Sequence, residues 1–171
     1  MTRFKCLRCS HCCFFTGEHD YPVVLEGEVK VLEEEARRRG VSLSFIKIAN
    51  GFYLWAIEGF CPFYDFASSS CTIHEKKPLA CRMFPLLLNI ARGTLNVSMM
   101  CDWVYVNRER VFKGDVRETF PDEVGAVSEL LSRLLGTRVT MKPANNKNEE
   151  GGEEKQNPVN KAGDHESKQQ N

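Results

Sequence analysis

The chain has 171 residues, of which 42% are hydrophobic, and this is enough for one main domain with a modest core. Its 23 basic residues balance its 23 acidic residues, and a net charge of zero argues against nucleic acid or an anionic membrane surface as the partner. The sequence contains no apolar run long enough for a transmembrane helix, and its N-terminus lacks the features of a secretion signal, so we expect a cytoplasmic protein.

The first predicted element follows a cysteine-dense segment that covers residues 1–22. A helix is expected over residues 26–39, because Val29, Leu32 and Ala36 fall on one stripe at three- and four-residue spacing. A glycine follows directly, as is usual after the end of a helix, and three arginines occupy the last turn, where the helix dipole favours cations.

Two β-hairpins are predicted in the middle of the chain. β-Rich runs at 43–49 and 52–57 flank an Asn-Gly dipeptide, which is the strongest short signal for a hairpin turn. A second hairpin is expected to turn at Arg92-Gly93, and the segment 58–82 between the hairpins is expected to be irregular with about one helical turn.

The last predicted element is an amphipathic helix over residues 121–135, with acidic residues near its start and a glycine after its end. Residues 142–171 contain no aromatic residue and few aliphatic ones, so we expect a disordered polar tail. The sequence therefore predicts a small α+β domain over residues 1–141, with two helices and two hairpins organised around a cysteine centre.

The most informative residues are eight cysteines, namely Cys6, Cys9, Cys12, Cys13, Cys61, Cys71, Cys81 and Cys101. An even number of cysteines could form disulfides, but that interpretation requires an oxidising compartment. Without a secretion signal, metal ligation is the better explanation. Disulfides remain the alternative, because intracellular proteins of hyperthermophiles can be rich in them.

The N-terminal cysteines have the spacing C-x-x-C-x-x-C-C, in which two intervening residues let successive thiolates turn back on one metal. Bacterial-type ferredoxins use such a run with a more distant fourth cysteine to bind a [4Fe-4S] cluster. Zinc sites use C-x-x-C as two separated pairs, so the spacing favours iron–sulfur and leaves zinc open. The adjacent Cys12 and Cys13 are expected to diverge, one joining Cys6 and Cys9 while the other serves a second ligand set or packs inside.

The four later cysteines are spread more widely, and each lies beside a predicted turn or strand end. Eight thiolates could make two four-thiolate sites, or one cluster together with structural cysteines. Arg82 follows Cys81 directly and is the candidate cofactor-binding residue, because a guanidinium could offset the charge of a cluster or donate a hydrogen bond to its sulfur atoms.

The C-x2-C-x2-C-C motif, Cys61-Pro62-Phe63 and the run from Cys71 to Pro85 together resemble the YkgJ-type cysteine-cluster family. This is a family of zinc- or iron-chelating domains, and the resemblance implies that the eight cysteines are the chelating set. It also implies a distant relation to flagellin lysine-N-methylases, which are larger proteins associated with an iron–sulfur cluster. His11 and His74 depart from the family pattern, so neither is expected to be an inherited ligand.

Three functions are compatible with this sequence. The first is an iron–sulfur protein with a redox or electron-transfer role and a redox partner. The second is a zinc-binding structural module that acts through a protein partner, and the third is lysine methylation, which depends on the family relationship alone. The sequence has no phosphate-binding loop or nucleophile motif that would identify an enzyme.

Overall fold

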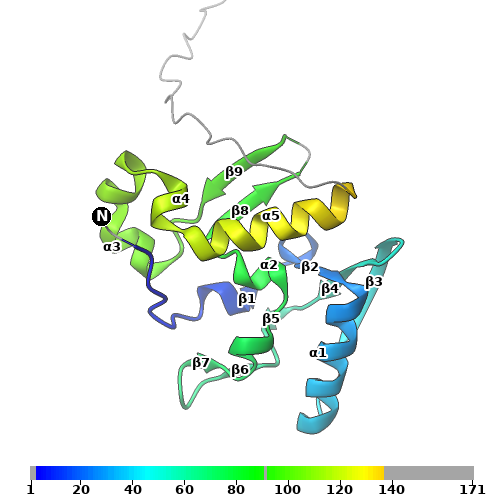
Figure 1. Ribbon diagram of the computed structural model, residues 1–171. Coiled ribbons are helices and arrows are strands. Elements are labelled where there is room, and N and C mark those ends of the chain that lie inside the picture. Colours follow the sequence, from blue (N-terminus) through cyan, green and yellow to red (C-terminus); the bar gives the residue numbers. More distant parts are fainter. Residues whose placement is uncertain (1–2, 91, 137–171) are drawn as a thin grey trace, which may run out of the picture.

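The computed structural model describes residues 3–90 and 92–136, which form an α+β protein with several small antiparallel sheets (Figure 1). Its α-helices within these ranges are α1 (Glu26–Arg39), α2 (Leu79–Arg82), α3 (Asp102–Lys113), α4 (Val116–Thr119) and α5 (Pro121–Leu135). Its strands are β1 (Phe14–Phe15), β2 (Val23–Leu25), β3 (Ser44–Ala49), β4 (Phe52–Ala56), β5 (Gly59–Phe60), β6 (Tyr64–Asp65), β7 (Ser70–Cys71), β8 (Leu86–Asn89) and β9 (Thr94–Val97).

The α+β class is confirmed, but the expected organisation of two helices and two hairpins is incomplete. Both predicted helices and both predicted hairpins are present, together with three further helices and several two- or three-residue strands in the described part of the chain. The predicted tail at 142–171 and the domain boundary before it lie outside the described residues.

Helix α1 begins and ends through local interactions of its own sequence. The Glu28 carboxylate accepts the backbone N–H of Leu25 at 2.8 Å, so a first-turn side chain satisfies a donor at the start of the helix. Gly40 ends the helix in the left-handed conformation at φ 65°. Glycine adopts this conformation with little steric strain because it has no Cβ atom. Leu32 and Ala36 are buried and hold the helix against the sheet.

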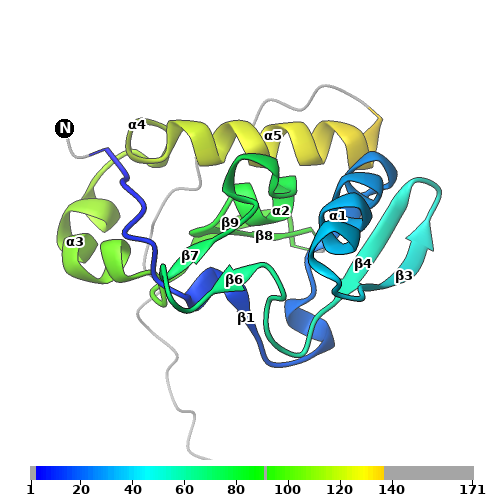
Figure 2. The ribbon, with the colours of Figure 1, turned by 90° about the horizontal axis from the view of Figure 1, so that it is seen from below.

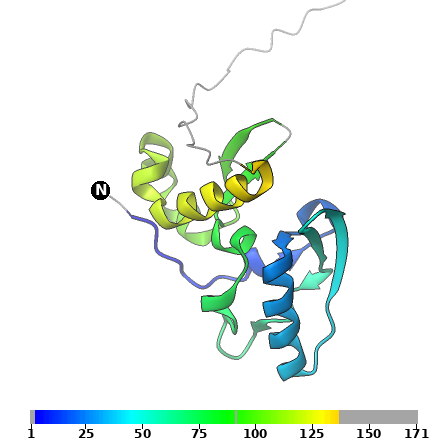
Figure 3. The same ribbon diagram turned by 45° about the vertical axis from the view of Figure 1, so that its right-hand side comes forward.

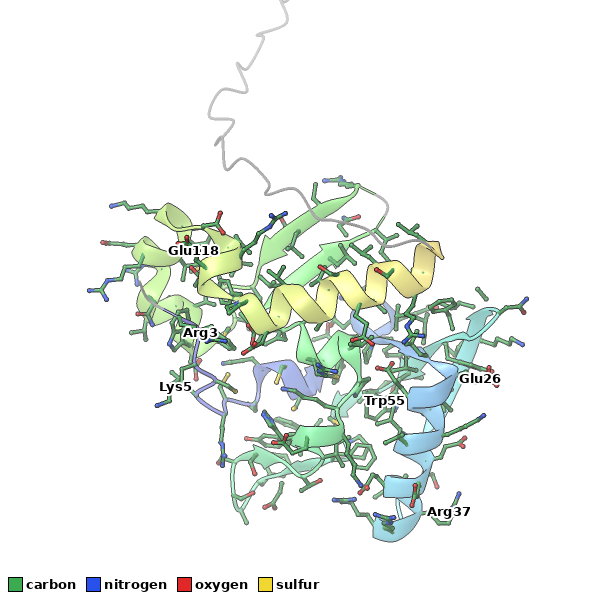
Figure 4. All side chains as sticks on the ribbon, in the orientation of Figure 1. Arg3, Lys5, Glu26, Arg37, Trp55 and Glu118 are labelled. Atoms are coloured by element: carbon green, nitrogen blue, oxygen red, sulfur yellow. The ribbon has the colours of Figure 1, made fainter. Side chains whose placement is uncertain are left out.

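The largest sheet contains three antiparallel strands in the order β2-β4-β3. The predicted hairpin forms β3 and β4, with Ile46 opposite Leu54, and β2 pairs with the other edge of β4 through Val24 and Tyr53. Trp55 on β4 is only 1% exposed and lies on the inner side of α1 (Figure 4). The sheet and α1 therefore enclose a hydrophobic core that extends to the cysteine-rich loops.

The second half of the chain packs α3, α4 and α5 around the β8–β9 hairpin. Helix α3 was not predicted, because its sequence is rich in β-branched and aromatic residues and exposes Tyr105 and Val106 (59% and 72%). Those exposed apolar residues obscure the helical period. Pro121 begins α5, and Gly136 ends it at φ 63°.

Two hydrophobic clusters occupy different parts of the molecule, and a third connects them. The first joins α1, β2 and β4 to the cysteine loops, and the second joins α3 and α5 to the hairpin. The connecting cluster is formed by Leu79 of α2 with Ala126 and Leu130 of α5. In Figure 3, α2 accordingly lies between α1 with its sheet and the helices α3 to α5.

The N-terminal segment runs from α3 to the middle of the molecule (Figure 2). Its start is fixed by the N–H of Phe4, which donates to the carbonyl of Thr119 at 2.7 Å. The Phe4 ring also packs edge-on against Trp103, with 5.2 Å between ring centroids. No helix in the two described ranges combines the length and the apolar character needed to cross a membrane.

Candidate metal centre

A cavity of about 150 Å³ lies where the N-terminal segment, the β6–β7 hairpin and α2 meet. Part of its wall is apolar and includes Trp55 and Tyr64. Seven of the eight cysteines line it, namely Cys6, Cys9, Cys12, Cys13, Cys61, Cys71 and Cys81. All eight cysteines are free of disulfide bonds.

Short strand ladders bring distant cysteines together at this cavity. Strands β1 and β5 pair antiparallel, and the ladder continues through the N–H of Cys61, which donates to the carbonyl of Cys13 at 2.7 Å. In the β6–β7 hairpin, Cys71 lies directly opposite Tyr64. The N–H of Tyr64 donates in turn to the carbonyl of Cys61 at 2.9 Å, so a tight turn joins the two short ladders and connects all three cysteines.

Helix α1 fixes the segment that carries Cys81. The second carboxylate oxygen of Glu28 accepts the backbone N–H of Leu79 at 2.8 Å and thereby holds the first turn of α2. Two residues after this contact, the N–H of Cys81 donates to the carbonyl of Pro78 at 2.9 Å. Glu28 therefore connects the start of α1 with the start of the cysteine-bearing helix α2, a role that sequence reasoning missed.

A second carboxylate of α1 holds the segment before α2. Glu35 is almost fully buried and lies 2.6 Å from both the Lys76 ammonium and the Arg39 guanidinium. Hydrogen bonds from Lys76 and then from Arg39 lower the pKa of Glu35 to about 2. The Arg39 guanidinium also reaches the carbonyl of Thr72, the residue after Cys71, at 3.4 Å.

The adjacent Cys12 and Cys13 do not diverge as expected. They lie in a 3₁₀ turn (His11–Cys13) and their Sγ atoms are 3.7 Å apart, so both face the cavity. Their mutual hydrogen bond favours the thiolate of Cys12, so it lowers the pKa of Cys12 to about 7 and raises the pKa of Cys13. A thiolate is the metal-binding form, so the lowered pKa prepares Cys12 to bind a metal near neutral pH.

The backbone N–H two residues after a cysteine acts on four of the sulfur atoms. The N–H of Arg8 donates to the Sγ atom of Cys6 at 3.4 Å. The N–H groups of Phe63, Ile73 and Trp103 lower the pKa values of Cys61, Cys71 and Cys101, respectively, against the larger effect of burial. Such N–H···S bonds favour the thiolate and are among the features that tune iron–sulfur centres. At Arg8, the first of these donors, the chain adopts φ 58°, a left-handed conformation that is uncommon for residues other than glycine.

Burial and nearby positive charge have opposite effects on the pKa values of the buried cysteine thiols in the cavity wall. Burial raises the pKa of Cys61 to about 12, and it also raises the pKa values of Cys71 and Cys81. Lys77 lines the cavity and opposes this effect, because its ammonium favours the thiolates of Cys71 and Cys81. Metal binding at this cavity would therefore release protons.

Two predicted site residues lie away from the cavity wall. Cys101 is 3% exposed and packs in the second hydrophobic cluster, beside Trp103. Burial raises the pKa of Cys101, as do the nearby Cys9 and Cys6. Arg82 lies in a shallow groove with Arg133 of α5, so its cofactor-binding role stays a prediction.

The donor chemistry of the cavity fits a thiophilic metal, since cysteine thiolates select zinc, copper(I) and iron–sulfur clusters. The donors lie around a space and do not meet at a point. Among the residues that the structure describes, no three His, Cys, Asp or Glu side chains converge closely enough to hold a single metal ion.

Comparison with known proteins agrees with this site. The family described as "Putative zinc- or iron-chelating domain", with the motif name CxxCxxCC, matches residues 5–108. The chain belongs to this family. All eight cysteines fall inside the matched region, and the family description supports iron or zinc as the bound metal.

One curated relative has no described function. The chain is 25% identical over 142 residues to Uncharacterized protein MJ0661 of Methanocaldococcus jannaschii, and the match covers 78% of this chain and 70% of the relative. No solved structure matches the chain significantly. The expected relation to flagellin lysine-N-methylases is supported by neither comparison.

Proposed function

We propose that this protein holds an iron–sulfur cluster, of the [4Fe-4S] type, through thiolates of the cavity. The observation that carries the proposal is the gathering of seven cysteines around one cavity of about 150 Å³. A mononuclear site uses four ligands, so seven thiols exceed what one zinc ion needs. The ferredoxin-like spacing of the N-terminal cysteines supports the same centre.

The arrangement of the donors also favours a cluster over a single ion. Zinc requires four ligands about 2.3 Å from one point, which places tetrahedral sulfur atoms roughly 3.8 Å apart. Cys12 and Cys13 have nearly this separation, at 3.7 Å, but no third donor in the described residues joins them at one point. Thiolates spread around a space suit the several iron atoms of a cluster.

A bound cluster would supply one-electron chemistry, and its potential would respond to the hydrogen bonds and charges around its sulfur atoms. The chain provides both kinds of influence. The N–H groups of Phe63 and Ile73 favour the thiolates of Cys61 and Cys71, and Lys77 in the cavity wall places a positive charge beside Cys71 and Cys81. These groups would favour the reduced form of the centre, which suits an electron-transfer role with a redox partner in a reducing cytoplasm.

Zinc is the second candidate, and the short Cys12–Cys13 separation is the observation that favours it. In that case the metal would be structural, and the protein would act by binding a partner. Lysine methylation has no comparable support from the described residues.

Anaerobic purification, followed by measurement of iron, zinc, acid-labile sulfide and the visible spectrum, tests the proposal. An iron–sulfur protein is coloured and contains iron and sulfide in matching amounts, and its absorption bleaches reversibly on reduction. A colourless protein with zinc and without sulfide would exclude the cluster and support the zinc candidate, because zinc is redox-inert.

A further inference from the structure

We propose that an aromatic cluster beside the cavity is the docking surface for a redox partner, a protein whose own docking face is apolar at its centre and basic at its rim. The cluster consists of Phe14, Phe60, Tyr64 and Phe66. This inference rests on the proposed function, because the partner exchanges electrons with the bound iron–sulfur cluster. It goes further in naming the surface and the chemistry of the partner that fits it.

The rings of the aromatic cluster are continuous with one another. Phe14 of β1 and Phe60 of β5 are paired across their ladder, and their ring centroids are 4.9 Å apart. Phe60 also packs against Tyr64 at 5.8 Å and against Phe66 at 4.8 Å, and 5.1 Å separates the centroids of Tyr64 and Phe66. The short strands β1, β5 and β6, which carry or adjoin these residues, lie next to one another in Figure 1.

Three of the four rings are open to solvent. The exposed fractions of Phe14, Phe60 and Phe66 are 47%, 42% and 65%. Single exposed apolar residues are common on protein surfaces, whereas rings that are exposed and also in mutual contact are typical of an interaction site. Aromatic side chains are enriched at the centres of protein–protein interfaces, where they contribute much of the binding energy. A docked protein is therefore the occupant that suits this cluster.

Tyr64 and Phe15 connect this surface with the cavity. Tyr64 lines the cavity and also packs against two of the exposed rings. Phe15 lines the cavity from β1, and the alternation of a strand places its neighbour Phe14 on the outer side. A partner on the aromatic cluster thus lies across these side chains from the cavity. In each transfer the reduced iron–sulfur cluster loses one electron and the partner's acceptor gains it, and no bond forms or breaks.

Carboxylates surround the aromatic cluster and determine the charge of the partner. Thr16 and Glu58 flank the end of the β1–β5 ladder, and the N–H of Thr16 donates to the carboxylate of Asp20 at 3.0 Å. Asp65 lies between the last two rings of the cluster in the sequence. These three carboxylates outnumber His19, which lies 3.5 Å from Asp20. A second copy of this chain would bring like charges together, whereas a basic rim is attracted and steered to the surface.

The test uses oxidised cytochrome c as the probe, because it is a one-electron haem protein with a basic docking face. The protein is reduced with dithionite, separated from excess reductant and mixed with the probe anaerobically, and the haem absorption gives the rate of electron transfer. Phe66→Ser removes the most exposed of the four rings, and Glu58→Lys reverses a charge of the rim. Each should slow transfer by about fivefold or more at low salt, with iron and sulfide content unchanged.

Two matched controls make the same chemical changes on α3. Phe112→Ser replaces a ring that is 46% exposed, and Glu109→Lys reverses an exposed charge. Neither residue lines the cavity or belongs to the aromatic cluster, so both variants should transfer electrons at the wild-type rate. The wild-type rate should also fall as salt is added, because salt screens the attraction, and Glu58→Lys should weaken this dependence.

The inference is overturned if Phe66→Ser and Glu58→Lys contain the full iron–sulfur cluster and transfer electrons at the wild-type rate, or if the controls on α3 slow transfer as much. A reduced wild-type protein that does not reduce the probe would overturn it as well. Because both substituted residues are exposed and act independently, either variant tests the surface if the other loses the cluster. Failure of the proposed function looks different, since the wild-type protein itself then contains no iron or sulfide and cannot be reduced.

Discussion

The N–H of Cys61 donates a 2.7 Å hydrogen bond to the carbonyl of Cys13, and this contact joins the two cysteine-rich parts of the sequence. It extends a ladder of two residue pairs, and a second such ladder places Cys71 opposite Tyr64. Backbone hydrogen bonds that do not require a metal therefore position Cys13, Cys61 and Cys71. A site formed in this way can be tested one side chain at a time.

Replacement of Cys61 or Cys71 by serine should release the cluster. Loss of a residue that only hydrogen-bonds to a metal ligand typically weakens metal binding by about 10–100-fold. Loss of a ligand itself should therefore weaken binding by more than ~100-fold. Iron and sulfide analysis after anaerobic purification measures the effect. Ser44→Ala, on the exposed strand β3, is the control and should retain the cluster. Full cluster content in both cysteine variants would show that these thiols are not ligands.

Glu28→Gln should destabilise the protein and loosen the metal site. The carboxylate accepts two amide protons, from Leu25 and Leu79, whereas a glutamine offers one oxygen and turns an NH₂ group toward the other amide. Hydrogen bonds to a charged group contribute roughly 1.5–3 kcal/mol, so we expect a loss of about 2 kcal/mol in urea unfolding. Glu34→Gln removes the exposed pair with Arg38 on the same helix and should cost under about 0.5 kcal/mol. Equal losses in the two variants would contradict the bridging role of Glu28.

Glu35 should make the stability of the protein depend on pH in the acid range. Its pKa in the folded protein is about 2, below its ordinary value, because Lys76 and Arg39 stabilise the carboxylate. A lowered pKa means that the stabilisation is fully present above about pH 5 and is lost as the pH falls toward 2. Glu35→Gln should therefore unfold at lower urea than wild type at pH 7, and the difference should shrink by pH 3. The comparison uses metal-free, reduced protein, so that protonation of metal ligands does not contribute. A difference in stability that does not change with pH would contradict this role of Glu35.

The left-handed conformation of Arg8 gives a prediction that separates backbone from side-chain effects. Arg8→Gly should keep metal affinity, because glycine adopts φ 58° without strain. Arg8→Val should weaken binding by about tenfold or more, since a β-branched residue is a strong outlier at positive φ and such strain costs of order 1–3 kcal/mol. Competition with a chelator measures both affinities. A similar loss in both variants would mean that the guanidinium, and not the turn, is what the site requires.

The sequence predicted those elements whose signals are local. Helix α1 and the β3–β4 hairpin carry their own apolar stripe or turn dipeptide, and both were placed within one or two residues. Helix α3 was missed because apolar residues such as Val106 remain exposed on it and blur the helical period. The two-residue ladders have no sequence pattern, since they depend on contacts between distant segments.

The cysteine site shows the same limit. The cysteine count and the family resemblance indicated all eight candidates. The spacing of the cysteines indicated neither that Cys12 and Cys13 face the same cavity nor that Cys101 lies apart from it. Those facts depend on a 3₁₀ turn and on the packing of α3, which are tertiary features. Glu28 was missed because a glutamate in the first turn of a helix is usually solvent-exposed. The sequence gives no sign that its carboxylate also accepts the N–H of Leu79 at the start of α2.

The iron and acid-labile sulfide content per chain of anaerobically purified protein tests most directly whether the gathered thiols hold an iron–sulfur cluster. We expect about four of each, with visible absorption that bleaches on reduction, and loss of both in Cys61→Ser. A colourless wild-type protein without sulfide, whether it contains zinc alone or no metal, would exclude the cluster.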